Sequence, residues 1–121
     1  MKKTLFTLIL ILAMFSAGFS QNTLVVEGNI TNIQTGGPII SHPVDVLIDS
    51  IGSGYVYFNT VLSNNNGYYA DTVQLPPDVT QGAVTTTSMD PCTGNYISQV
   101  GFFDPANMVV TLNFDFCQNS P

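Results

Sequence analysis

The stretch VTLNFDF, residues 110–116, decides the fold class, because apolar and polar residues alternate in it without a break. A period of two is the pattern of a β-strand that has one buried face and one exposed face. The buried face would carry Val110, Leu112, Phe114 and Phe116, and the other face Thr111, Asn113 and Asp115. We therefore expect one continuous strand over this stretch.

The same alternation recurs earlier in the chain. One face of residues 24–30 carries Leu24, Val26, Gly28 and Ile30, and one face of residues 44–48 carries Val44, Val46 and Ile48. Softer strand patterns, rich in aromatic and β-branched residues, cover residues 55–62, 68–75, 82–89 and 96–103. The phase of the last is ambiguous, because both Ile97 and Val100 favour burial.

Turn signals rich in Gly, Pro, Asn and Asp separate these segments, and no helical period is sustained after the first twenty residues. About seven short strands in about 100 residues, with no helix between them, predict an all-β fold. We expect a single antiparallel two-sheet sandwich over residues 21–121.

The run NNNGYY, residues 64–69, has two readings. Asn66 and Gly67 both tolerate positive φ, so the run favours a tight hairpin between residues 55–62 and 68–75. The alternative is a weak ligand site for sugars, in which Tyr68 is a platform and Asn64 and Asn65 are hydrogen-bond donors.

The first twenty residues have the layout of a secretory signal peptide, which we expect to be a helix. Lys2 and Lys3 precede an almost wholly apolar run, residues 4–15, and small residues precede Gln21. The run is too short to span a bilayer comfortably, since a span needs about 20 residues. We expect cleavage after Ser20 and a secreted protein, outside the cell, at the cell surface or in a periplasm, with no membrane attachment after cleavage.

Charge excludes one class of partner. The whole chain has a formal net charge of −6, and loss of Lys2 and Lys3 would leave −8, with no Lys or Arg. Such a chain cannot build a phosphate-binding surface, so nucleic acid is excluded as a partner. Anionic membrane surfaces are disfavoured for the same reason.

Cys92 and Cys117 are the two cysteines of the chain. In an exported protein an even cysteine count favours a disulfide, although two buried free thiols would also fit. The bridge would close a loop of about 25 residues, worth roughly 3.5 kcal/mol in the chain-entropy model.

Catalytic groups are scarce. His42 is the single histidine, and Ser41 and Asp45 lie near it. Adjacent residues of an extended backbone point to opposite faces, so Ser41 and His42 are poorly placed to act as nucleophile and base. We expect no catalytic residues and no enzyme activity.

Metal and cofactor sites are not predicted. Calcium takes carboxylates, and Asp49, Asp90 and Asp104 lie at expected strand ends, but no calcium-loop spacing is present. We interpret these residues as turn caps and surface charges, and expect no cofactor.

Several motifs together resemble the carboxypeptidase regulatory-like family of secreted bacterial proteins. They are Val26–Ile30, Gly36–Ile39, Val44–Val46, Thr60–Tyr69, Val84–Thr87, Cys92 and Asn113–Cys117. The resemblance implies a prealbumin-like or Ig-like sandwich, without catalysis, that supports, spaces or adheres. One departure is Asn64, where the family usually has Asp.

Two hypotheses for the function follow. The first is a secreted noncatalytic module with a structural, spacer or adhesive role, whose partner is a protein at the cell surface. The second is a carbohydrate-binding module that uses exposed Tyr and Asn side chains on a neutral glycan.

Overall fold

The computed structural model describes residues 22–117, which form eight β-strands and no helix. The strands are β1 (Asn22–Asn32), β2 (Pro43–Ser50), β3 (Val56–Leu62), β4 (Tyr68–Leu75), β5 (Gly82–Met89), β6 (Tyr96–Phe103), β7 (Val109–Thr111) and β8 (Phe114–Phe116). The all-β class is confirmed, but the expected count of about seven strands was wrong. The predicted signal peptide, residues 1–20, lies outside the described residues, among which no helix could cross a membrane.

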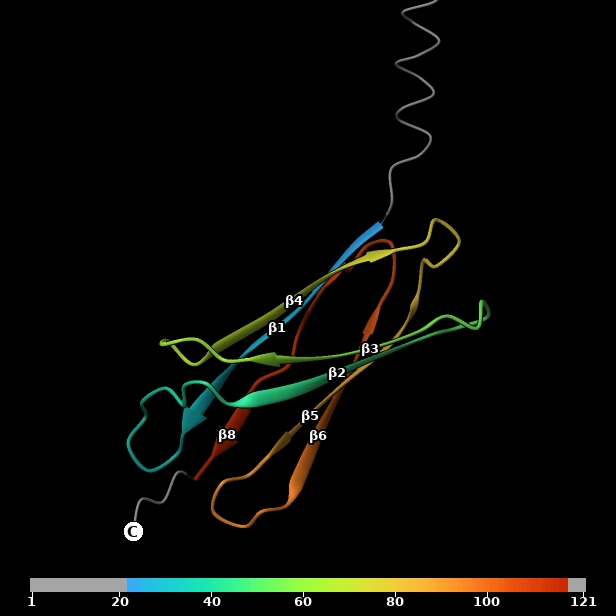
Figure 1. The fold of residues 1–121 in the computed structure, drawn as a ribbon. Helices are drawn as coiled ribbons and strands as arrows, with labels where there is room; N and C mark the ends of the chain where they lie inside the picture. The colour runs from blue at the N-terminus through green and yellow to red at the C-terminus, as the bar shows by residue number, and fades with distance from the viewer. Residues whose placement is uncertain (1–21, 118–121) are drawn as a thin grey trace, which may run out of the picture.

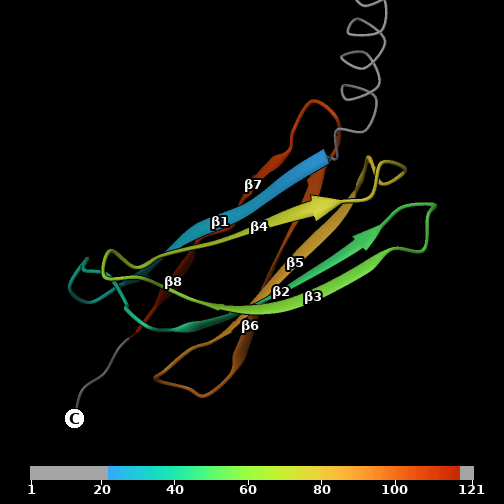
Figure 2. The ribbon, with the colours of Figure 1, turned by 45° about the horizontal axis from the view of Figure 1, so that its top comes forward.

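The strands form two four-stranded sheets (Figure 1). In the first, named here the β1 sheet, the order is β4-β1-β7, and β8 also pairs with β1. In the second, the β2 sheet, the order is β3-β2-β5-β6 and every pair is antiparallel. Figure 2 shows the β4–β1 pair in one layer and β3, β2 and β5 in the other. The predicted two-sheet sandwich is therefore present.

Residues 110–116 fall in two short strands, β7 and β8, and both pair with β1 in parallel. The expectation of one strand in an antiparallel sheet was wrong here. Between β7 and β8 the Leu112 amide still donates to the Glu27 carbonyl at 2.8 Å. The next partner of β1 is a side chain, because the Asn29 amide donates to Asn113 Oδ1 at 2.8 Å. The amide side chain replaces a backbone acceptor and interrupts the ladder.

Close approach at this interruption explains Gly28. A Cβ atom at Gly28 would lie 2.0 Å from the Leu112 carbonyl oxygen and 2.8 Å from Cε1 of Tyr69. The same carbonyl accepts a hydrogen bond from the Tyr69 hydroxyl. Glycine therefore lets three strands, β1, β4 and the β7–β8 segment, meet around one carbonyl group.

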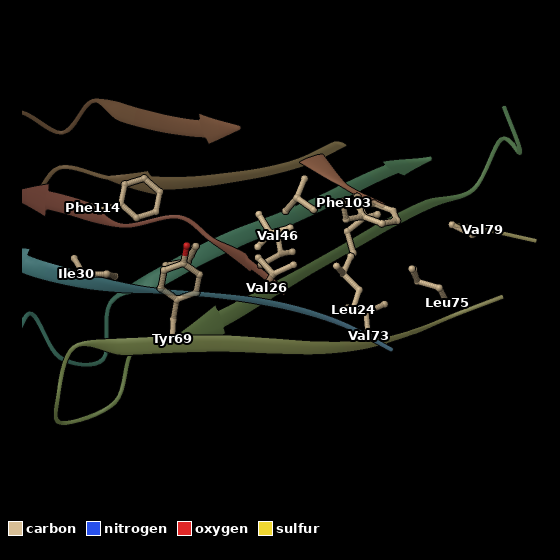
Figure 3. Close-up of a cluster of buried hydrophobic side chains, with 14 of the residues drawn as sticks. Leu24, Val26, Ile30, Val46, Tyr69, Val73, Leu75, Val79, Phe103 and Phe114 are labelled. Atoms are coloured by element: carbon tan, nitrogen blue, oxygen red, sulfur yellow. The ribbon is translucent and has the colours of Figure 1, made fainter. Parts of the chain in front are cut away.

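The core lies between the two sheets, and Figure 3 shows side chains of both layers meeting there. The predicted buried faces of β1 and β2 are confirmed, since Leu24, Val26, Val44 and Val46 are all fully buried. Each such side chain contributes about 1.5–3 kcal/mol of transfer free energy. In β6 the ambiguity is resolved, because Val100 is 56% exposed on the outer face.

The NNNGYY turn exists, but it does not make a hairpin. β3 and β4 belong to different sheets, and β4 pairs with β1 from Asn22–Leu75 to Asn29–Tyr68. The turn is held on the β1 side, because the Gly67 carbonyl accepts the Ile30 amide at 2.7 Å. A Cβ at Gly67 would lie 2.6 Å from the Ile30 carbonyl oxygen, and its φ is 73°. The turn signal was correct, and the expected partner of β4 was wrong.

The Cys92–Cys117 disulfide is confirmed, with the two Cα atoms 5.6 Å apart. Cys92 lies in the loop between β5 and β6, and Cys117 directly follows β8. The bridge therefore joins the β2 sheet to the end of the β1 sheet.

Candidate functional site

The predicted ligand site on the NNNGYY turn consists of side chains with different surroundings. Asn64 Oδ1 accepts the amides of Asn66 at 2.9 Å and Tyr68 at 3.1 Å. Its oxygen therefore caps the turn, as expected if the run NNNGYY is a turn and not a ligand site. The Asn65 side chain is exposed and makes no hydrogen bond within residues 22–117. The turn brings Asn64, Asn65 and Tyr68 near one another in sequence, but commits two of them to internal bonds.

Tyr68 is half-buried and tied to β1. Its hydroxyl donates to Glu27 Oε2 at 2.7 Å. The pKa of Tyr68 is raised above its ordinary value, and the largest cause is this hydrogen bond, with partial desolvation the next largest. The ring is therefore fixed along the outer face of the β1 sheet, and its hydroxyl is already in use.

The triad of Ser41, His42 and Asp45 does not assemble. His42 Nε2 lies 2.7 Å from the Met89 carbonyl, which can only accept, so Nε2 carries the proton. The imidazole also packs edge-on against Phe116, with ring centroids 5.8 Å apart. Asp45 Oδ1 instead accepts the Thr60 hydroxyl at 2.7 Å. His42 thus links the start of β2 to the end of β5 and to the core beneath the disulfide.

A shallow hollow of about 170 Å³ lies beside His42, at the disulfide end of the β2 sheet. Its lining includes Asp45, Thr87 and Tyr96, and Tyr96 is 71% exposed. A carboxylate, a hydroxyl and an exposed ring thus line one hollow, whose volume lies below the roughly 300–1,000 Å³ of ordinary small-molecule pockets. Tyr96 was not predicted as a site residue, although its position in an expected strand flanked by turns was visible in the sequence.

The acidic residues considered for calcium lie apart. Asp90 Oδ1 caps the β5–β6 loop by accepting the Cys92 amide at 2.9 Å. Asp104 Oδ1 accepts the amides of Ala106 and Asn107, both at 2.9 Å. Asp49 lies within β2. Among residues 22–117 no three His, Cys, Asp or Glu side chains group as a metal site would require.

Sequence reasoning missed a polar contact between the sheets. Asp71 of β4 is 8% exposed, and its Oδ2 accepts the Tyr57 hydroxyl at 3.0 Å and Asn59 Nδ2 at 3.2 Å. Desolvation and the contact with Asp71 raise the pKa of Tyr57. The signal was present in the strand phase, since Asp71 lies two residues from both Tyr69 and Val73 and therefore shares their inward face. This contact joins β3 to β4, across the edge where the hairpin was expected.

Sequence comparisons assign none of these side chains a role. No protein-family model matches the chain, and no curated protein matches it. The candidate sites are therefore defined by geometry, namely the NNNGYY turn, the hollow at Tyr96 and the contacts around Asp71.

Proposed function

We propose that this chain is a noncatalytic structural module, a spacer or adhesive unit that acts outside the cell or at its surface. The observation that carries the proposal is how its polar side chains are used. His42, Asp45 and Tyr68 each bond to another strand or strand end of the sandwich. Side chains engaged in this way stabilise a scaffold.

Two features support export. The first twenty residues have the composition of a signal peptide. The bridge between Cys92 and Cys117 adds independent support, because disulfides persist in oxidising compartments and are rare in the cytosol.

The family proposal is the carboxypeptidase regulatory-like one, in its prealbumin-like form. In the constant-type Ig arrangement the first two strands share a sheet. Here β1 and β2 lie in different sheets, and β2 lies between β3 and β5. This strand order departs from the constant-type Ig arrangement, so of the two forms that the resemblance implies we propose the prealbumin-like one, and the proposed family modules support and space without catalysis.

A thiol-labelling experiment on intact cells tests the proposal. We expect the protein in the medium or the surface fraction, with Cys92 and Cys117 unlabelled by a maleimide until a reductant is added. Recovery of the protein inside the cell, with both thiols free, would contradict the proposed location and role.

Carbohydrate binding is the second candidate, and the hollow at Tyr96 favours it. The exposed Tyr96 ring offers a face for a sugar ring, and Asp45 lies in the same lining, where its carboxylate can accept hydrogen bonds beyond the one from Thr60. The test is depletion of the protein from solution by insoluble polysaccharides. Binding lost in Tyr96→Ala and kept in Tyr68→Ala would place the glycan in the hollow. The reverse pattern would place it on the NNNGYY turn, and no depletion by any polymer would count against the function.

A further inference from the structure

The two edges of the β2 sheet are unprotected. β3 (VYFNTVL) and β6 (YISQVGFF) form these edges, and neither contains a charged residue or a proline. Soluble proteins usually guard an edge strand with Lys, Pro, a bulge or a charge, because its free N–H and C=O groups can pair with another chain. Both edge strands of this sheet therefore lack a charged residue or proline that would oppose pairing.

The charged residues of the strands lie away from the two edge strands of the β2 sheet. Residues 22–117 carry eight carboxylates, and in the β2 sheet only the inner strand β2 carries any, at Asp45 and Asp49. The β1 sheet is different: its edge strand β4 carries Asp71, and the opposite side is split into β7 and β8, where Asp115 is exposed. Only the β2 sheet offers two continuous, uncharged edges.

The side chains next to these edges are exposed and apolar. On β3 the outer face carries Val56 and Phe58, which are 62% and 64% exposed. On β6 it carries Val100 and Phe102, which are 56% and 70% exposed. Each open edge of the sheet therefore has two large exposed apolar side chains beside it, which a paired second chain would cover.

Strand direction decides which partner fits. Because each pair in the order β3-β2-β5-β6 is antiparallel, β3 and β6 run in opposite directions. A second copy in the same orientation can therefore place its β6 beside β3 of the first as a further antiparallel pair. This contact is head-to-tail, so it leaves one edge free at each end and can repeat into a filament.

The register of the sheet supports the same partner. One row of outward residues runs Phe58–Leu47–Thr85–Val100, and the next runs Val56–Asp49–Ala83–Phe102. Continued into a second copy without a shift, these rows put Val100 beside Phe58 and Phe102 beside Val56. Aromatic residues opposite β-branched ones are among the cross-strand pairs that stabilise sheets.

We propose that β3 of one copy pairs with β6 of a second copy, extending the β2 sheet from molecule to molecule. The inference deepens the structural role proposed above and rests on it. Like charge on the copies opposes the contact, so assembly strengthens with salt, which screens that repulsion.

The test is sedimentation velocity of the secreted protein over a range of concentrations at low and high salt. We expect association that salt favours. Phe58→Lys and Val100→Glu should each weaken it by about tenfold or more, because each puts an unpaired charge at the contact. The double variant Phe58→Lys/Val100→Glu should restore association, since Lys and Glu then face each other across the contact.

The matched control is Val109→Glu, which changes a valine of similar exposure, 54%, in the other sheet. It should associate like the unchanged protein. A thermal unfolding transition checks that each variant folds. If Phe58→Lys unfolds, Val56→Lys replaces it, and Phe102→Glu then replaces Val100→Glu, because Phe102 is the residue that faces Val56 across the proposed contact.

The proposal would be overturned by a monomer under every condition, by equal effects of Val109→Glu and Val100→Glu, or by no rescue in the double variant. Loss of association in Phe58→Lys with none in Val100→Glu would instead indicate pairing of β3 with β3, which contradicts the head-to-tail contact. A folded, disulfide-closed protein that is found outside the cell and stays monomeric would contradict the proposed self-assembly, but it would still agree with the proposed spacer role.

Discussion

Gly28→Ala is the sharpest test of how β1 packs against β4 and the β7–β8 segment within the β1 sheet. The added Cβ would lie 2.0 Å from the Leu112 carbonyl oxygen and 2.7 Å from the Leu112 carbonyl carbon. Real contacts of this kind are essentially never below 3.0 Å, so the backbone must move by roughly 1 Å, the difference between 3.0 and 2.0. A moving backbone cannot be relieved by a change of rotamer, as a side chain could.

The expected magnitude follows from what the movement breaks. Overpacking costs about 1–3 kcal/mol. Displacing Leu112 also weakens its hydrogen bonds with Tyr69 and Glu27, at about 1 kcal/mol each. Replacing a strand glycine by alanine returns about 0.5–1 kcal/mol of chain entropy. We expect a net loss of about 3 kcal/mol in the free energy of unfolding, which lowers Tm by about 12–24 °C in a domain of this size.

Urea unfolding followed by tyrosine fluorescence measures this loss, since the chain contains no Trp. Gly37→Ala is the control, because a Cβ there would meet only the Thr35 hydroxyl, at 3.3 Å. We expect that control to stay within about 0.5 kcal/mol of the unchanged protein. Equal midpoints for Gly28→Ala and Gly37→Ala would refute the close approach of β1 to the β7–β8 segment.

Three further predictions concern the links between the layers. Replacing Cys92 and Cys117 together by Ser should cost about 3.5 kcal/mol in urea unfolding, because the closed loop no longer restricts the unfolded chain, and an unchanged midpoint would contradict that role. Asp71→Ala leaves the Tyr57 hydroxyl and the Asn59 side-chain amide without their acceptor. We expect it to lower the free energy of unfolding by about 1–3 kcal/mol in the same assay. An unchanged free energy of unfolding would mean that water serves both donors equally well. The pKa of Tyr57 is raised in the folded protein, so the stabilisation that its protonated hydroxyl provides is complete below the ordinary pKa of 10.0 and is lost as the pH rises through the folded value. Urea midpoints measured up to strongly alkaline pH should therefore fall less steeply in Tyr57→Phe than in the unchanged protein. Identical slopes for the two proteins would speak against the contact.

Local pattern predicted the phase of the strands. The alternation around Val26 and Val46 placed the same residues inside as the structure does, because a period of two fixes which side chains share a face. The disulfide was predictable for a similar reason, since two cysteines allow one pairing.

Local pattern could not predict which strands pair. A β-strand looks the same in sequence whether its neighbour is parallel or antiparallel, so the parallel pairing of β7 and β8 with β1 was missed. The turn at Gly67 indicated a change of direction, but its bond to Ile30, which draws the turn onto β1, depends on residues far away in the chain.

The candidate sites depended on such distant contacts even more. Tyr68 looked like an open platform until Glu27, 41 residues away, was found bonded to its hydroxyl. The sequence shows that β3 and β6 contain no charged residue, but only the strand order shows that these two strands are the edges of one sheet.

The intact mass of the native protein, before and after reduction and alkylation, tests the central claim most directly, namely an exported, disulfide-closed structural sandwich. We predict a mass for residues 21–121 that lacks two hydrogens until the Cys92–Cys117 bond is reduced. A mass that retains residues 1–20, or native cysteines that alkylate without reductant, would contradict the account.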